Sequence, residues 1–206
     1  MIKKKGFTLV EMLVVISVLS VIGVLILIIF QRTLRGANKS QILSSIKQNG
    51  QAVLEMMDKT IRNAENVVCP AIPSGSTLAS STGLVIERAG QYTRYRFVAA
   101  TTSVNGQIKQ DGPTKQKVGD RDETDTEFIN RICNIADPLS SQALILTDTN
   151  LQTGVSLENG SFIRNRQFGF RDVVSIQFDL RPGQGAPQAV AGQIDPVTFQ
   201  TTVQLR

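Results

Sequence analysis

The residue types that most often do chemistry in proteins are scarce in this chain. Its 206 residues include no histidine and two cysteines, Cys69 and Cys133. Without histidine, neither a Ser-His-Asp nor a Cys-His arrangement is available, and two cysteines are too few for an ordinary zinc site. Only carboxylate, lysine or tyrosine chemistry remains for a general acid or base. The composition therefore disfavours an enzyme, and we expect no cofactor.

The densest group of carboxylates lies between residues 119 and 127. Asp120, Asp122 and Asp125 have a spacing similar to that of calcium ligands in a loop. However, the segment lacks the glycine and the closing glutamate of an EF-hand loop, and Arg121 interrupts the acidic run. We interpret it as a solvated loop, predict no metal site, and keep calcium as the weaker alternative.

A second group combines cations with aromatic rings over residues 88–96. If this segment is a strand, alternation places Tyr92, Arg94 and Arg96 on one face. Such a face binds single-stranded DNA when the bases stack on the rings and the arginines contact phosphate. A polar face turned to solvent is the more common outcome, so nucleic acid is kept as a secondary alternative partner.

The longest apolar run covers residues 7–30, FTLVEMLVVISVLSVIGVLILIIF, and follows the basic cluster Lys3, Lys4 and Lys5. A helix of 24 residues is about 36 Å long, which is enough to cross the hydrocarbon core of a membrane. The positive-inside rule then keeps the three lysines cytoplasmic and places the rest of the chain outside. A secretory signal peptide has a shorter apolar core and a small-x-small cleavage site, and neither is present.

Glu11 is a carboxylate inside this apolar run. A charge at the middle of a bilayer costs roughly 2–3 kcal/mol, and less near the interface. One interpretation is that Glu11 reaches back to water from the first turn of the helix. The other is that it has a functional role and a cationic partner. The residue types alone leave both interpretations open.

Residues 3–11, KKKGFTLVE, stand directly before the apolar helix and resemble the prepilin leader of type IV pilins and type II secretion pseudopilins. The resemblance implies that prepilin peptidase cleaves after Gly6 and that the new N-terminal Phe7 is methylated. It also implies that Glu11 of an incoming subunit pairs with the Phe7 amine of a neighbour and sets the axial register. The expected partners are thus prepilin peptidase, other pilin or pseudopilin subunits, and an inner-membrane assembly platform.

We expect the helix to continue beyond the membrane. From Ile42 to Val68, apolar residues recur at steps of mostly three or four, as one buried helix face requires. Cys69-Pro70 should end the helix. The expected organisation is a cytoplasmic leader over 1–6, a transmembrane and assembly helix over 7–30, an amphipathic continuation over 31–69, and an extracytoplasmic β-rich head over 70–206.

The head has the pattern of short strands and turns. Strands are predicted at 84–88, 92–98, 107–110, 143–147, 155–157, 162–164, 173–180 and 198–205. Cys69 and Cys133 would lie in a compartment that permits oxidation, so they are a candidate disulfide, with two buried unpaired thiols as the alternative. The predicted fold class is α+β: a long N-terminal helix, transmembrane in its first half, packed on a C-terminal antiparallel β-sheet head.

Two further segments, 54–64 and 199–206, resemble parts of large minor (J-type) pseudopilins and large minor pilins. The predicted function is therefore a minor subunit near the tip of a type IV pilus or a type II secretion pseudopilus. The sequence does not distinguish these systems. One alternative is a signal-anchored binding module, such as an adhesin or DNA receptor, that does not polymerise. Another is a carboxylate-dependent hydrolase on a membrane stalk, for which we identify no carboxylate pair.

Overall fold

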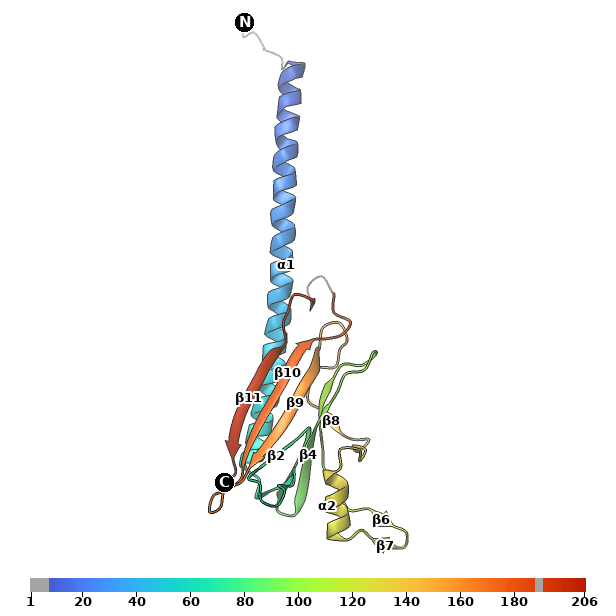
Figure 1. The fold of residues 1–206 in the computed structure, drawn as a ribbon. Coiled ribbons are helices and arrows are strands. Elements are labelled where there is room, and N and C mark those ends of the chain that lie inside the picture. The colour runs from blue at the N-terminus through green and yellow to red at the C-terminus, as the bar shows by residue number, and fades with distance from the viewer. Residues whose placement is uncertain (1–7, 188–190) are drawn as a thin grey trace. The chain divides into compact units, whose positions relative to one another are not determined.

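The structure is a computed structural model that describes residues 8–187 and 191–206 (Figure 1). The chain divides into two compact units, Met1–Gln41 and Ile42–Arg206, which are described separately. The elements in chain order are α1 (Leu9–Arg62), β1 (Asn66–Cys69), β2 (Leu78–Ser81), β3 (Gly83–Arg88), β4 (Gln91–Val98), β5 (Gln107–Asp111), β6 (Lys117–Val118), β7 (Arg121–Asp122), α2 (Asp125–Cys133), β8 (Leu144–Ile145), β9 (Val155–Asn165), β10 (Val173–Pro182) and β11 (Val197–Gln204).

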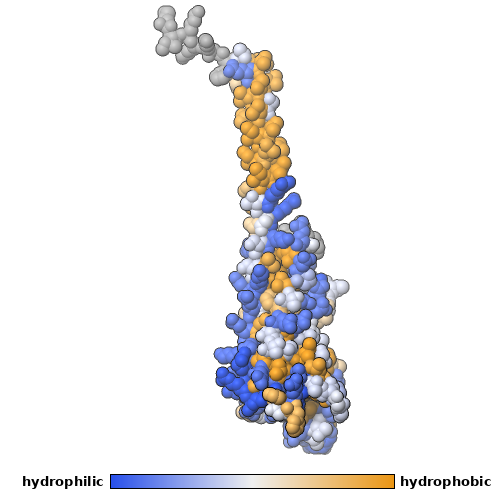
Figure 2. Space-filling view, turned by 60° about the vertical axis from the view of Figure 1, so that its left-hand side comes forward, coloured by the Kyte–Doolittle hydropathy of each residue, from blue (hydrophilic) through white to orange (hydrophobic). Residues whose placement is uncertain are grey.

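In the first unit, the described residues form the N-terminal part of α1. Its large apolar side chains are exposed on every side, and the most apolar window has a mean hydropathy of 3.3 with none of its residues buried. By length and composition this helix is able to cross a membrane. Figure 2 shows its apolar surface as an orange band. The hydroxyls of Ser17 and Ser20 donate to helix carbonyls at 2.8 and 2.9 Å, which satisfies their polar groups without water.

In the second unit, the part of α1 after Gln41 buries one face. Its buried residues follow steps of three or four, which confirms the predicted periodicity: Ile46, Gly50, Val53, Met57 and Ile61. The phenyl ring of Phe199 on β11 packs directly on Gly50, where a Cβ atom would overlap the ring. The glycine therefore allows the strand to approach the helix closely.

The helix ends earlier than predicted. It stops at Arg62 rather than continuing to Val68, and Asn66–Cys69 forms strand β1. The backbone N–H of Glu65 already donates to the carbonyl of Glu87 on β3 at 2.9 Å. Pairing with β3 satisfies the backbone groups of this segment and competes with the helix, although the apolar periodicity runs on.

The strands form two larger antiparallel sheets and a small hairpin. Their orders are β1-β3-β4-β5-β8, β11-β10-β9-β2 and β6-β7. The predicted strands at 155–157 and 162–164 are one strand, β9, which pairs with β10 along its length. In β10, the even-numbered residues are buried, whereas the odd-numbered residues are half-buried or, at Gln177, exposed, so the predicted alternation is confirmed. Phe97 of β4 stacks on Phe162 of β9 with ring centroids 4.4 Å apart, which joins the two sheets in one core.

The segment interpreted as an acidic loop contains a helix, α2, and the hairpin β6-β7. Thr124 and Glu127 form a capping box, in which each side chain accepts a hydrogen bond from the other residue's backbone N–H. Phe128 and Ile132 are buried against Cys69 and neighbouring side chains. The spacing Thr-x-x-Glu predicts this helix start from the sequence alone. The segment was instead interpreted as a solvated loop because of its many carboxylates.

Candidate functional site

Glu11 lies in the first turn of α1. Its backbone N–H donates to the Thr8 hydroxyl at 3.2 Å, and the N–H of Met12 donates to the Thr8 carbonyl at the same distance. Thr8 therefore caps the start of the helix. A carboxylate in the first turn is also favoured by the helix dipole. These contacts fix Glu11 at the N-terminal end of an exposed apolar helix.

The Glu11 carboxylate has no hydrogen-bond or ion-pair partner within residues 8–187 and 191–206. Its side chain is exposed in a segment whose neighbours are apolar. A carboxylate in apolar surroundings needs a countercharge, so this geometry leaves room for a cation from outside these residues. The other expected site residues, Lys3, Lys4, Lys5, Gly6 and Phe7, lie outside the described residues.

The arginines of β4 do not form a surface for nucleic acid. Arg94 and Arg96 are only 2% and 8% exposed. Arg94 donates to both carboxylate oxygens of Asp111 at 2.8 and 2.6 Å and to Asp137 at 2.5 Å. Arg96 donates to the backbone carbonyls of Asn134, at 3.1 Å, and Asp137. The interpretation of this strand face as a solvated or DNA-binding surface is therefore wrong, because residues after α2 cover it.

The buried network around Arg94 keeps the Asp111 carboxylate ionised. Burial by itself raises the pKa of Asp111, but the hydrogen bond from Arg94 and the backbone N–H of Ser140 outweigh it, so the pKa lies below its usual range. Burial and the nearby charge of Arg94 lower the pKa of Arg96. A carboxylate that stays ionised and fully paired is suited to holding the fold and poorly suited to exchanging protons.

Three carboxylates of the acidic segment form ion pairs with cations of the same chain. Lys115 contacts Asp125 at 2.5 Å, Arg121 contacts Glu127 at 2.5 Å, and Arg131 contacts Glu123 at 2.8 Å. Asp120, Asp122 and Asp125 are not brought together as a metal-binding group. In the part of the chain that the structure describes, no group of three or more His, Cys, Asp or Glu residues is placed to hold a metal ion.

Cys69 and Cys133, the candidate disulfide, are joined in the structure, with their Cα atoms 5.6 Å apart. The bond connects the end of β1 to the last residue of α2. It closes a sequence separation of 64 residues. The disulfide thereby holds α2 against the edge of the five-stranded sheet.

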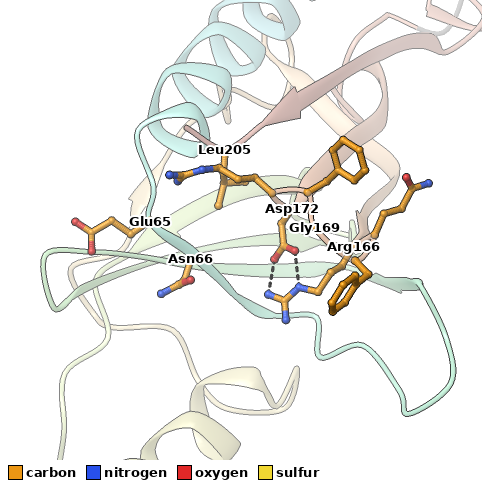
Figure 3. A pocket seen from close by; sticks show the side chains of 10 residues that line it. Glu65, Asn66, Arg166, Gly169, Asp172 and Leu205 are labelled. Atoms are coloured by element: carbon orange, nitrogen blue, oxygen red, sulfur yellow. Dashed lines mark hydrogen bonds and ion pairs between the residues drawn. The ribbon is translucent and has the colours of Figure 1, made fainter.

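A cavity of about 430 Å³ opens beside the loop between β9 and β10 (Figure 3). Its lining includes Glu65, Asn66 and Leu205, together with residues 166–172. Asp172 is engaged by Arg164 at 2.6 Å and by Arg166 at 2.6 Å. Burial by itself raises the pKa of Asp172. The hydrogen bonds from the two guanidinium groups lower it by more, so the pKa lies below its usual range. This carboxylate is bound on both sides rather than free to act as an acid.

Residues 1–27 match a sequence family described as the prokaryotic N-terminal methylation motif. The match contains the basic cluster, Gly6, Phe7, Glu11 and most of the apolar run. Together with the long apolar helix and the antiparallel sheets, the match supports the predicted resemblance to type IV prepilins and pseudopilins. The chain carries the N-terminal motif of the type IV prepilin and pseudopilin family, as its resemblance predicted. No curated protein and no solved structure matches the chain.

Proposed function

We propose that the chain is a structural subunit of a type IV pilus or a type II secretion pseudopilus. Prepilin peptidase cleaves it after Gly6, and the mature chain assembles with other subunits through its N-terminal helix. The observation that carries this proposal is the methylation motif over residues 1–27, which includes the start of an apolar helix with no buried residue in its most apolar window. Its place is that of a minor subunit near the tip, in line with the resemblance of 54–64 and 199–206 to large minor subunits.

The apolar helix supplies the energy for both stages of this function. Side chains such as Leu13, Ile16 and Ile29 are 60–64% exposed. Burying a side chain of this size is worth about 1.5–3 kcal/mol, so the helix is stable only in lipid or among other apolar helices. Before assembly the membrane covers it, with the basic leader cytoplasmic and the head extracytoplasmic. In the filament the helices of neighbouring subunits replace the lipid.

Glu11 gives the assembly its register. Cleavage after Gly6 creates an amine at Phe7, and in apolar surroundings an amine and a carboxylate each need an opposite charge. The Glu11 side chain has no countercharge in the described part of the chain. Pairing with the Phe7 amine of a neighbouring subunit satisfies both charges. Helix packing alone permits sliding, whereas the ion pair selects one axial position.

Replacing Glu11 tests this role. For Glu11→Val we expect normal membrane insertion and cleavage but at least a tenfold loss of incorporation into sheared filaments. Glu55→Val is the matched control, since Glu55 is an exposed carboxylate on the same helix outside the apolar run. Wild-type incorporation of Glu11→Val would contradict the register role.

The N-terminus of the protein from native membranes tests processing. Mass spectrometry should find a mature chain that begins with N-methylated Phe7. An intact Met1, with the peptidase shown to act on another substrate, would favour the signal-anchored binding module. A DNA receptor is the less supported form of that alternative, because Arg94 and Arg96 are buried.

A further inference from the structure

The loop between β9 and β10 presents two phenylalanines to solvent. Phe168 and Phe170 are 105% and 71% exposed, and every other exposed large apolar side chain described after Gln41 is at most 56% exposed. Residues 167–171 are called the aromatic tip. A phenylalanine left in water forgoes the hydrophobic gain of burial, so two such residues on one short loop indicate a contact surface.

The residues on either side of the aromatic tip, Arg166 and Asp172, are held by ion pairs and hydrogen bonds. Arg166 donates to both oxygens of Asp172 at 2.6 and 2.8 Å, and Arg164 donates to the same carboxylate at 2.9 Å. Figure 3 shows the paired contacts between Arg166 and Asp172. The backbone N–H of Arg166 also donates to the Thr77 carbonyl at 2.9 Å.

A tight turn shapes the tip itself. The N–H of Phe170 donates to the Gln167 carbonyl at 3.1 Å, and Gly169 has a φ of +80°. The left-handed conformation of Gly169 favours glycine at this position. Because these contacts hold both ends of the loop and its turn, little backbone freedom remains to be lost when the tip binds.

Around the aromatic tip, Arg164, Arg166 and Arg171 stand against the carboxylates of Asp172 and Glu65, and the exposed charge at the tip itself is that of Arg171. Arg171 is exposed, and the Arg166 side chain is 53% exposed even though it contacts Asp172. The charge of Asp172 is matched by two arginines, and Glu65 is the other carboxylate lining the cavity. A partner surface complementary to the tip therefore combines an apolar recess with carboxylates at its rim.

We propose that the aromatic tip docks into an apolar recess, rimmed by Asp or Glu side chains, on a partner protein. A protein fits better than a bilayer for two reasons. The chain has no tryptophan, and both tyrosines lie on β4, so the tip lacks the residues that favour the membrane interface. The cavity of about 430 Å³ beside it also makes an uneven surface that a shaped protein surface fills. This contact goes beyond filament assembly and does not require the N-terminal helix.

Photo-crosslinking in the native envelope tests the proposal with the full-length chain. A benzophenone analogue of phenylalanine replaces Phe168, and the same analogue replaces Ser141, an exposed residue of another loop, as the control. We expect a discrete protein adduct only from position 168, with Asp or Glu beside apolar residues in the crosslinked peptide. Adding Phe170→Ser should lower the yield roughly tenfold or more, which corresponds to the burial of one aromatic side chain.

Variants of Arg171 separate charge from folding. Arg171→Glu should lower the adduct yield roughly tenfold, whereas Arg171→Lys should retain most of it. Formation of the Cys69–Cys133 disulfide reports whether each variant folds. An adduct with lipid alone, an adduct between two copies of this chain, or an adduct insensitive to Arg171→Glu would overturn the proposal.

The outcome is separable from that of the proposed function. If mass spectrometry finds the mature Phe7 terminus and position 168 gives no adduct, tip docking fails while the filament role stands. If the adduct forms on a chain with an intact Met1, the filament role fails while tip docking stands.

Discussion

At the scale of single residues, two glycines of the same helix have different roles. A Cβ atom at Gly50 would overlap the Phe199 ring, whereas a Cβ atom at Gly36 meets nothing within 4 Å. Glycine in a helix interior ordinarily costs about 1 kcal/mol relative to alanine. At Gly50 this cost is offset by the close packing of Phe199 from β11. The glycine is therefore explained by a contact between the helix and a strand far away in the sequence.

We therefore expect opposite effects from two identical substitutions. Gly50→Ala should lower the free energy of unfolding by about 1–3 kcal/mol, because the ring must move. Gly36→Ala should leave it unchanged or raise it by up to about 1 kcal/mol. Denaturant unfolding of the detergent-solubilised full chain, followed by near-ultraviolet circular dichroism, measures both. A Gly50→Ala chain as stable as the wild type would show that the ring has room to shift.

Asp172 gives a prediction of pH dependence. Its pKa in the folded chain lies below the value of about 3.9 for an unfolded aspartate. The unfolded chain therefore binds its proton first as the pH falls. The stability due to this group is complete above about pH 4 and is lost as the pH drops through the folded pKa.

Replacing this carboxylate should change both stability and its dependence on pH. Asp172→Asn leaves the buried Arg164 without its countercharge, which costs on the order of 3–5 kcal/mol at pH 7. The loss of stability between pH 5 and pH 2 should then be smaller than in the wild type. Asp120→Asn, at an exposed carboxylate, should change stability by less than about 0.5 kcal/mol. Equal acid sensitivity in Asp172→Asn and the wild type would rule out this linkage.

At the scale of elements, α2 is held by one covalent bond and a small apolar cluster. Cys133 ends the helix and is bonded to Cys69, while Phe128 and Ile132 pack beside that bond. The helix also supplies Arg131, which contacts Glu123 at 2.8 Å. The segment after α2 then provides the groups that cover Arg94 and Arg96. The position of α2 therefore controls the burial of the arginine network.

Breaking the disulfide should release this element. For Cys133→Ser we expect a loss of about 2–5 kcal/mol in the free energy of unfolding and faster proteolysis after α2. Thr124→Ala, which removes the helix cap, should cost only about 1 kcal/mol. Limited proteolysis with mass spectrometry of the fragments compares the two variants. If cleavage after α2 is no faster in Cys133→Ser, the apolar cluster alone is enough to hold the helix.

At the scale of the whole molecule, the exposed apolar helix should decide where the protein is found. We expect the full chain to stay in the membrane pellet after alkaline carbonate treatment and to dissolve in detergent. Leu19→Arg, in the apolar run, should shift part of the chain to the supernatant, because an arginine at the centre of a membrane helix costs about 2.5–3.5 kcal/mol. Leu78→Arg, at an exposed apolar position on β2, should have no such effect. Carbonate extraction of the wild-type chain would contradict membrane insertion.

The sequence by itself determined what depends on neighbours along the chain. The basic cluster and the apolar run are continuous, so composition and order were enough to predict a membrane-spanning helix, while the prepilin expectation came from the resemblance of KKKGFTLVE to a family leader. The buried face of α1 from Ile46 to Ile61 and the alternation in β10 follow from periods of 3.6 and 2 residues. The Thr124–Glu127 capping box was equally local, and its helix was missed although its signal was present.

Only the tertiary structure decided what depends on residues far apart in sequence. Arg94 looked like a surface residue because its partners, Asp111 and Asp137, are 17 and 43 residues away. Likewise, β1 replaced the end of the predicted helix because β3 supplied backbone partners that the helix period does not reveal. The exposure of Phe168 also had no local signal, since apolar residue type favours burial everywhere. Periodicity records which face of an element is apolar, but burial and ion pairing depend on which distant segment covers that face.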